Sequence, residues 1–411
     1  MIKAGLDIGN SKISFIIADY KNIENIKILS IASVPNNNIK KNIILNFENL
    51  HDQIKSLVIE AEKQSQTKLN SINLNLSLLN SNSHYYNSEI ELKNERISEL
   101  HLKKIINQSE YFDNQSEKFE IFNNITSYDI DNNLYFNAPI GNYSDNIKIN
   151  FYKIYIQKKY SDNISSVIKK LKLNIDNYIP SPLSSSLSSL TKDEKELGTI
   201  CIDLGHSTSS ISVFENNKFV YGDAIGVGSN NVTLDIARGL STNISSAERL
   251  KTLYGSLVSS PSDDHEIIEI PIISGDKNTF KQITRSSLNA IIRPRIEETL
   301  EMIWQKIRDN NLRNKKLNNV VLTGGGAMMD NIEKYVETIF ASGVRVSNPL
   351  DQLNLENNFK KPNFCDIIGS ILYDQDLFKI DFLANQSKNS KKRGISGFFD
   401  RCRPKLANNS H

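Results

Sequence analysis

The stretch Gly198–Phe214, which reads GTICIDLGHSTSSISVF, indicates how the chain folds. Its first residues are apolar or β-branched and end on Asp203, a pattern typical of a buried strand. Gly205 permits a tight turn, small hydroxyl residues follow, and Ile211–Phe214 resumes the strand pattern. Backbone N–H groups in such a turn can point at an anion, so we expect a phosphate-binding hairpin here.

The chain begins with the same pattern. Residues 1–17 read MIKAGLDIGNSKISFII, and the segment Asp7-Ile-Gly-Asn-Ser-Lys12 aligns with Asp203-Leu-Gly-His-Ser-Thr208. A single Asp-x-Gly-x-Ser segment is usually only a surface turn. Two copies in the same setting predict two similar half-molecules whose hairpins grip the phosphates of a nucleotide. Asp7 and Asp203 would then be placed to hold Mg²⁺ through water.

A third segment fits the same site. Asn319–Ala327 is a strand pattern that runs into three consecutive glycines, Gly324 to Gly326. Without side chains, this backbone can be approached closely by a flat ring or a sugar. The ordered set of hairpin, hairpin and strand-GGG, separated by helical stretches, is far more specific than any one of its parts.

The ordered set resembles the superfamily of actin, Hsp70 and the sugar kinases. Three further stretches narrow the resemblance to the FtsA family of actin-like bacterial division proteins: Asp193–Gly198, Val232–Ser241 with Ala247–Lys251, and the basic C-terminal end. The resemblance covers almost the whole chain and is weakest between about Ser81 and Gln157. It implies an α/β, actin-like (ribonuclease H-like) fold with two lobes, duplicated ATPase domains and a small α+β insert of the type named 1C.

The expected domain boundaries follow from this resemblance and from changes in the pattern of apolar and polar residues along the chain. We expect a first lobe (1A) at 1–80 and 158–192, the insert at 81–157, and a second lobe (2A) at 193–375 with a 2B subdomain at about 226–300. A flexible linker is expected at 376–392 and an amphipathic membrane-targeting helix at 393–406. Apolar residues at helical spacing predict helices over Phe47–Gln64 and Leu288–Arg308, and Tyr128–Tyr135 resembles a hairpin tip.

The resemblance implies that ATP and Mg²⁺ are the cofactors. Glu248 and Lys251 are three residues apart and share a helix face; an exposed ion pair is the alternative, but their place in the motif favours contact with the adenosine. Gly228 opens a helix whose N-terminal amides would face phosphate, with Asn231 as the N-cap; a capped helix after a glycine turn is the alternative. The expected nucleotide contacts are Asp7, Gly9, Asn10, Ser11, Lys12, Asp203, Gly205, His206, Ser207, Thr208, Gly228, Glu248, Lys251, Gly324, Gly325 and Gly326, with Asp7 and Asp203 also serving the metal.

The C-terminal end carries a possible membrane anchor. Residues 391–406 read KKRGISGFFDRCRPKL, and four side chains fall on one helical stripe: Ile395, Phe398, Phe399 and Cys402. Cations flank the stripe at Lys392, Arg393, Arg401 and Arg403. We expect this segment to become helical on anionic lipid. The alternative is a disordered basic tail, although exposed phenylalanines add nothing to solubility.

Composition sets further bounds. The formal charge of +2 requires no nucleic-acid partner, and the three cysteines are scattered, which suits a reducing compartment. No apolar run reaches the roughly 18 residues of a membrane span. The N-terminus continues as a strand pattern, so we do not expect a signal peptide.

The second hairpin departs from the Asp-x-Gly-Gly-Gly-Thr-Thr-Asp pattern that is usual in the family. His206 and Ser207 stand where glycines are usual, and Ser210 replaces an aspartate. No nucleophilic triad or metal-ligand cluster is visible in the sequence, and no catalytic residue is assigned. We therefore expect nucleotide binding with weak or no ATPase activity.

The implied function is that of a structural adaptor. Such a protein self-associates, binds the C-terminal tail of FtsZ at 2B and late division proteins at 1C, and tethers the division ring to the cytoplasmic face of the inner membrane at the septum. The alternatives are an Hsp70-like ATPase, a sugar kinase or an actin-fold protein of the pilus-assembly type. An Hsp70 would continue into a β-rich domain, a kinase would carry an acidic base beside a sugar pocket, and a pilus-assembly relative would lack the amphipathic end.

Overall fold

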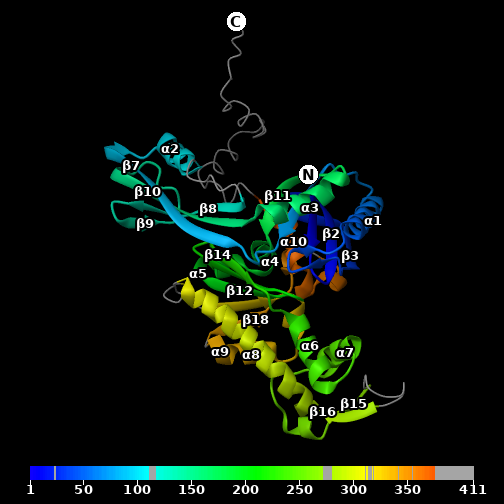
Figure 1. Cartoon of the computed structure of the whole chain (residues 1–411). Coiled ribbons are helices and arrows are strands. Elements are labelled where there is room, and N and C mark those ends of the chain that lie inside the picture. The colour runs from blue at the N-terminus through cyan, green and yellow to red at the C-terminus, as the bar shows by residue number, and fades with distance from the viewer. Residues whose placement is uncertain are drawn as a thin grey trace.

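A computed structural model describes residues 1–22, 25–110, 117–271, 280–310, 312, 317, 319–340, 342–353 and 355–374. The predicted linker at 376–392 and the predicted amphipathic helix at 393–406 lie outside these residues. The described chain forms two lobes around two mixed β-sheets, with a third sheet extending to one side (Figure 1). Within the described residues, no helix is both long and apolar enough to cross a membrane.

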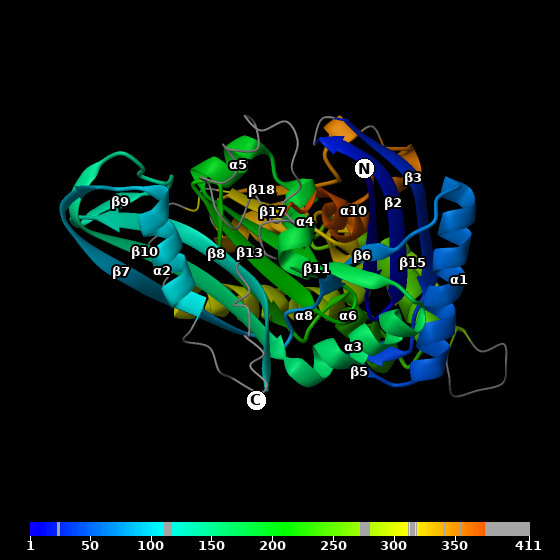
Figure 2. The same ribbon diagram turned by 90° about the horizontal axis from the view of Figure 1, so that it is seen from above.

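The first sheet is built around the N-terminal hairpin. Its strand order is β11-β6-β1-β2-β3, with β1 antiparallel to β2 and parallel to β6. The helices α1 and α3 lie on one face and α4 and α10 on the other (Figure 2). The bounds are β1 Ile2–Ile8, β2 Lys12–Asn22, β3 Asn25–Pro35, β4 Ile39–Lys40, β5 Ile43–Ile44, α1 Phe47–Ser65, β6 Ser71–Leu76, α3 Lys158–Lys170, β11 Asn174–Pro180, α4 Ser181–Ser189 and α10 Cys365–Leu372.

The second sheet repeats this topology. Its order is β14-β13-β12-β17-β18, with β12 antiparallel to β13 and parallel to β17. Asp7 lies opposite Ser14 in the first hairpin, and Asp203 lies opposite Ser210 in the second. The bounds are α5 Lys192–Leu197, β12 Thr199–Leu204, β13 Ser209–Glu215, β14 Lys218–Ile225, α6 Ser229–Leu240, α7 Ile244–Tyr254, β15 Ile267–Pro271, β16 Phe280–Thr284, α8 Arg285–Asp309, β17 Asn319–Thr323, α9 Ile332–Phe340 and β18 Gly343–Val346, with short 3₁₀ turns at Pro261–Asp264, Gly325–Met328, Asp351–Leu353, Asn357–Phe359 and Pro362–Phe364.

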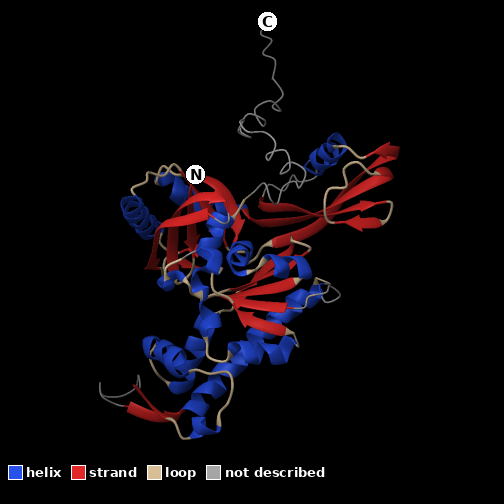
Figure 3. Cartoon of the chain, turned by 180° about the vertical axis from the view of Figure 1, so that it is seen from behind, coloured by secondary structure: helices blue, strands red, loops and turns tan. Residues whose placement is uncertain are grey.

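The third sheet contains the long strands of the predicted insert and extends away from the two lobes (Figure 3). Its order is β7-β10-β8-β9, and it has a small core of its own under α2. Side chains from this sheet hydrogen-bond to the backbone of β14, the edge strand of the second sheet. Tyr152 Oη accepts from Gly222 N at 2.8 Å and donates to Gly222 O at 3.1 Å. The bounds are β7 Asn82–Arg96, α2 Glu99–Glu110, β8 Lys118–Ile130, β9 Asn133–Tyr135 and β10 Tyr143–Gln157, and the further contacts to β14 are Tyr85 Oη to Val220 O and Asn124 Nδ2 to Phe219 O.

Several predicted elements are found as expected. The helix predicted over Phe47–Gln64 is α1, and its buried residues fall at helical spacing: Leu50, Ile54, Leu57, Val58 and Ala61. The helix predicted over Leu288–Arg308 is α8, with Pro294 inside it, and the hairpin tip at Tyr128–Tyr135 joins β8 to β9. One expected boundary needs a correction. The second lobe was expected to run to residue 375, but α10 returns to the first lobe and packs on β1, β2 and β6.

Two short helices, α4 and α10, pack closely against each other, and α4 also contacts strands β12, β13 and β14 of the second sheet. α4 reads SPLSSSLSS, and its serines at 184–186, 188 and 189 are at most 1% exposed. Ser184 Oγ donates to Asp366 O at 2.7 Å, and Ser188 Oγ donates to Cys365 O at 2.6 Å, so α4 is bonded to the start of α10. A Cβ atom added at Gly369 would lie 1.7 Å from Ser184 O, closer than any real contact.

We predict that Gly369→Ala lowers the free energy of unfolding by about 2–4 kcal/mol, because the atom it strikes is backbone and cannot rotate away. Urea denaturation of the full chain measures this. Gly343→Ala is the matched control, since the nearest atom to its added Cβ is Asn319 Oδ1 at 3.4 Å, and its effect should stay within about 0.5 kcal/mol. Equal stability of Gly369→Ala and the wild-type chain would show that α4 and α10 separate easily.

Candidate functional site

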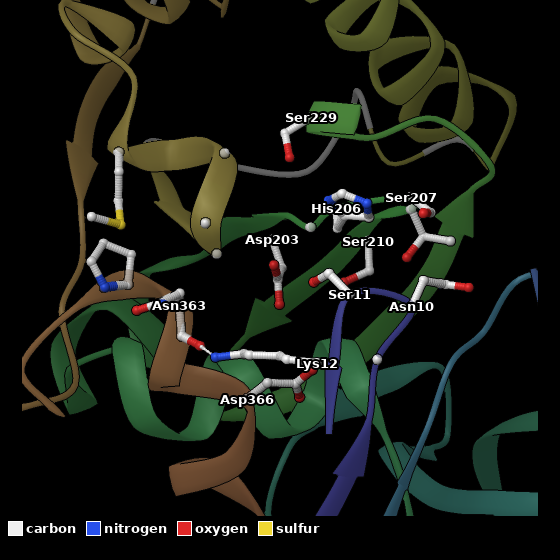
Figure 4. A pocket seen from close by; sticks show the side chains of 18 of the residues that line it. Asn10, Ser11, Lys12, Asp203, His206, Ser207, Ser210, Ser229, Asn363 and Asp366 are labelled. Carbon is white, nitrogen blue, oxygen red and sulfur yellow. Dashed lines mark hydrogen bonds between the residues drawn. The ribbon is translucent and has the colours of Figure 1, made fainter. Parts of the chain in front are cut away.

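A pocket of about 630 Å³ lies between the two lobes, at the ends of both hairpins (Figure 4). The first hairpin, the second hairpin, the glycine turn and α7 all contribute residues to its lining. Of the predicted nucleotide contacts, those that line this pocket are Asp7, Gly9, Asn10, Ser11, Lys12, Asp203, Gly205, His206, Ser207, Thr208, Glu248, Lys251, Gly324, Gly325 and Gly326.

Gly228 has a different place. It is the N-cap of α6 and does not line the pocket. A Cβ atom at this position would lie 2.6 Å from His206 O, so glycine lets the start of α6 pack directly on the second hairpin. The prediction that Asn231 caps this helix is wrong: α6 begins at Ser229, and Asn231 Oδ1 instead accepts from Gly228 N at 3.1 Å.

The chain folds back closely on itself at the glycine of each hairpin turn, more tightly at Gly205 than at Gly9. A Cβ atom at Gly9 would lie 3.0 Å from Lys12 O, and one at Gly205 would lie 2.6 Å from Thr208 O. Gly9 N donates to Lys12 O at 3.0 Å, which closes the first turn. The duplicated sequence therefore produces duplicated turns for the same steric reason.

The glycine turn fits against the second hairpin. Gly324 has φ +83°, a left-handed conformation that glycine adopts without strain. A Cβ atom there would lie 2.1 Å from Asp203 Oδ1, and one at Gly326 would lie 2.9 Å from Leu204 O. Both glycines are thus required for close packing against β12, and the backbone of this turn forms one wall of the pocket.

Three carboxyl groups share the base of the pocket. Burial raises the pKa of Asp7 to about 6, and Lys12 only partly opposes this effect. Burial, reinforced by the charge of Asp7, raises the pKa of Asp203 to about 7. Asp366 has a pKa well above its usual value, first because of burial and then because of Asp7 and Asp203. A cation brought to this base would therefore be stabilised by more negative charge than Lys12 can balance.

Lys12 lies within this carboxyl cluster. Its Nζ donates to Asn363 O at 2.6 Å and lies 4.4 Å from the centre of the Phe364 ring. Figure 4 shows Lys12 extended between Asp203 and Asp366, with its ammonium directed at Asn363. The predicted phosphate ligand therefore also connects the first hairpin to the segment that precedes α10.

The predicted pair on α7 forms a bonded network. Lys251 Nζ donates to Glu248 Oε2 at 2.7 Å, to Thr233 Oγ1 at 2.8 Å and to Ser229 O at 3.1 Å. The Lys251 side chain is 7% exposed, whereas that of Glu248 is 45% exposed. All three ammonium hydrogens of Lys251 have acceptors, and these bonds join α7 to α6. Because Glu248 is the more exposed member of the pair, it is the one that can reach a ligand.

Sequence reasoning missed Asp366 and the residues around it. Asn75 Nδ2 donates to Asp366 Oδ1 at 3.1 Å, while Asn75 Oδ1 and Asn363 Oδ1 are buried without a hydrogen-bond partner. All three residues line the pocket. The available signal was a lone carboxylate in the otherwise apolar helix CDIIGSIL. Other lining residues that were missed include Arg285, Met328, Met329 and Asp330.

The donor set suits a hydrated metal ion and a phosphate tail. Oxygen donors and carboxylates at the base match the preferences of Mg²⁺, and turns of this kind are typical of phosphate sites. Among the residues that the structure describes, no three Asp, Glu, His or Cys side chains converge as direct metal ligands. Cys201 and Cys365 are free, buried thiols near this region. The predicted membrane residues, Lys392 to Arg403, lie outside the described part of the chain.

The sequence comparisons match this chain to cell division protein FtsA. The model of the family described as cell division protein FtsA matches residues 200–369. The FtsA protein of Agrobacterium fabrum is 28% identical over 381 residues, which is 90% of this chain and 86% of that protein. The FtsA protein of Neisseria meningitidis is 27% identical over 365 residues, covering 89% of this chain and 88% of that protein.

Solved structures extend the comparison to the whole described fold. A chain of the PilM–PilN type IV pilus biogenesis complex matches with a TM-score of 0.62 at 13% identity, covering 90% of this chain and 97% of that chain. MreB5 of Spiroplasma citri bound to ADP matches with a TM-score of 0.53 at 14% identity, covering 95% of this chain and 99% of that chain. The predicted resemblance to FtsA and the predicted actin-like fold are confirmed.

The carboxyl cluster predicts how stability depends on pH. A carboxyl group whose pKa is raised by folding contributes stability that is complete below its unfolded pKa and is lost as the pH rises toward its folded pKa. Asp366→Asn removes this loss and keeps an oxygen that can accept from Asn75. The stability of the nucleotide-free variant relative to wild type should therefore increase between about pH 5 and pH 8, by at most about 1.4 kcal/mol per pH unit.

Urea denaturation at both pH values measures the difference. The control is Asp351→Asn, because the Asp351 side chain is 98% exposed; it shows how much of the trend comes from losing a solvated carboxylate. If the stability of Asp366→Asn relative to wild type did not rise between the two pH values, Lys12 would be holding the Asp366 carboxylate in its charged form.

Proposed function

We propose that this chain, an actin-like relative of the cell division protein FtsA, binds ATP with Mg²⁺ in the pocket between its lobes and serves as a membrane-bound adaptor in division. The proposal that the chain binds a nucleotide rests on one observation: two equivalent hairpins face one pocket, with Asp7 and Asp203 at its base. The solved MreB5 chain, which has the same fold, was determined with ADP.

Each part of the pocket has a role in this proposal. The two hairpin turns would face the phosphates, and Asp7 and Asp203 would hold Mg²⁺ through water. A bound Mg²⁺ would neutralise phosphate charge and orient the tail. Glu248 lies where the ribose is expected, and the glycine turn lines the side where the base would lie.

The pocket residues favour binding over rapid turnover. Ser210 lies opposite Asp203 in the hairpin, so the carboxylate that is usual in the family at this position is replaced by a hydroxyl. Hydrolysis requires a group that orients water against the γ-phosphate, and a serine hydroxyl is a weak base for this task. We propose that ATP acts as a ligand that controls self-association.

The partner surfaces are proposed from the family resemblance together with exposed apolar side chains. The β15–β16 hairpin of the second lobe exposes Ile267 (54%) and Phe280 (61%), and we propose this region for the FtsZ tail. The far end of the insert exposes Leu100 (75%), Leu134 (57%) and Tyr143 (68%), and we propose this region for late division proteins. Exposed apolar side chains gathered on one surface are typical of protein contacts.

The nucleotide proposal is tested by a change at the base of the pocket. Asp203→Asn should weaken binding of ATP in the presence of Mg²⁺ by about tenfold or more, because an amide cannot replace a carboxylate facing a dication. Calorimetric titration with and without Mg²⁺ measures this, and binding of metal-free ATP should change much less. Asp264→Asn on the exposed turn after α7 is the control; equal affinities of Asp203→Asn and wild type would count against the proposed metal position.

The membrane proposal is tested at the C-terminal end. The intact chain should sediment with anionic vesicles, and Phe398→Ala/Phe399→Ala should remain in solution because the stripe loses the side chains that enter the acyl layer. Phe280→Ala is the control, as it removes an exposed phenylalanine elsewhere. If the intact chain itself stays in solution, the basic end is a solvated tail, and the proposal that this chain is a membrane-bound adaptor is contradicted.

A further inference from the structure

The imidazole of His206 projects into the space where the two hairpins face each other. Figure 4 shows its ring in the opening bordered by Ser229, Ser210 and Ser11, above Asp203. His206 is half-buried, and its ring makes no hydrogen bond with any residue that the structure describes. A polar ring with two nitrogen atoms thus faces the pocket without a protein partner.

The backbone that carries this ring is fixed. His206 O accepts from Asn230 N at 2.8 Å, and Gly205 O accepts from Ser229 N at 2.9 Å. Gly228 packs against the same carbonyl groups so closely that no side chain fits between them. The backbone of the turn cannot move away from the pocket without breaking its contacts with α6, so the imidazole stays within reach of a ligand bound between the hairpins.

The charges around His206 determine its protonation. The charged groups that face it are Glu248 and Lys251 on α7 and, deeper in the pocket, Asp7, Lys12 and Asp203. Burial and then Lys251 lower the pKa of His206, while Glu248 opposes them. The ring is therefore mostly neutral at neutral pH when the pocket holds no anion. A polyphosphate beside the ring would favour the imidazolium form, whose N–H groups are strong donors to phosphate oxygen.

We propose that the His206 imidazole binds the phosphate tail of the nucleotide directly and takes up a proton from solvent as it does so. This inference rests on the nucleotide binding proposed above. His206 thereby supplies positive charge at a turn where glycine is usual in the family. Because the bound state holds more protons than the free state, affinity is highest at low pH and falls as the pH rises through the bound-state titration of the ring.

The experiment compares ATP binding, with Mg²⁺ present, by full-length wild type, His206→Asn and His206→Gly at about pH 6 and pH 8. Wild type should lose at least about fivefold more affinity than either variant between these pH values. The aspartates at the base and the nucleotide titrate in all three proteins, so the difference between proteins isolates His206. His265→Asn, at an exposed position outside the pocket, should keep the wild-type dependence.

A second readout counts protons directly. Calorimetric titration at about pH 7 in buffers of different ionisation enthalpy should show that wild type takes up a larger fraction of a proton than His206→Asn. If all the proteins bind ATP with the same pH dependence and proton count, the inference is overturned while the proposed nucleotide site stands. If His206→Gly binds more tightly at every pH, the ring is an obstruction and the inference is also overturned. If wild type binds no ATP, the proposed function fails first.

Discussion

The concentration of carboxyl groups at the base of the pocket is the constraint around which the rest of the structure is arranged. Two copies of one hairpin place Asp7 and Asp203 at equivalent registers, and the fold brings the two strand ends together. α10 adds Asp366 to the same place. One ammonium, that of Lys12, cannot balance three carboxylates away from bulk water. The raised pKa values of these carboxyl groups favour retained protons in the nucleotide-free protein, and the proposed Mg²⁺ would displace them.

Both lobes form hydrogen bonds with the peptide segment Pro362–Asn363 beside this cluster. Pro362 O accepts from Thr323 Oγ1 at 3.1 Å and from Gly324 N at 3.2 Å, both in the second lobe. The next carbonyl, that of Asn363, accepts from Lys12 in the first hairpin. Adjacent carbonyl groups thus receive donors from both halves of the molecule. Together with the close approach of α4 and α10, these bonds couple the position of each hairpin to the segment that leads into α10.

The parts of the site that are formed by short, continuous segments could be predicted from the sequence. A strand, a glycine turn and its repeat lie within short windows, so the two hairpins and the glycine turn could be predicted, and nearly all of their predicted residues line one pocket. Asp366 could not be predicted, because it reaches the pocket only through the return of α10 to the first sheet, a contact across most of the chain. Gly228 was predicted to contact phosphate because a glycine at the start of a helix is common in phosphate sites. In the structure, the absence of a side chain at Gly228 instead allows α6 to pack closely on the second hairpin. Asn231 was misjudged because a residue that can cap a helix can equally bond back from inside the first turn.

The hydrogen bonds between the insert and β14 have a consequence for solubility. β14 is the outer strand of the second sheet, and a bare outer strand offers unpaired N–H and C=O groups to any other extended chain. The side chains of Tyr85, Asn124 and Tyr152 occupy several of these groups. The insert therefore protects the sheet against edge-to-edge aggregation, whatever partners it binds. A chain from which residues 82–157 are removed would lose this protection together with any docking surface, so point substitutions at the far end of the insert separate the two roles where deletion cannot.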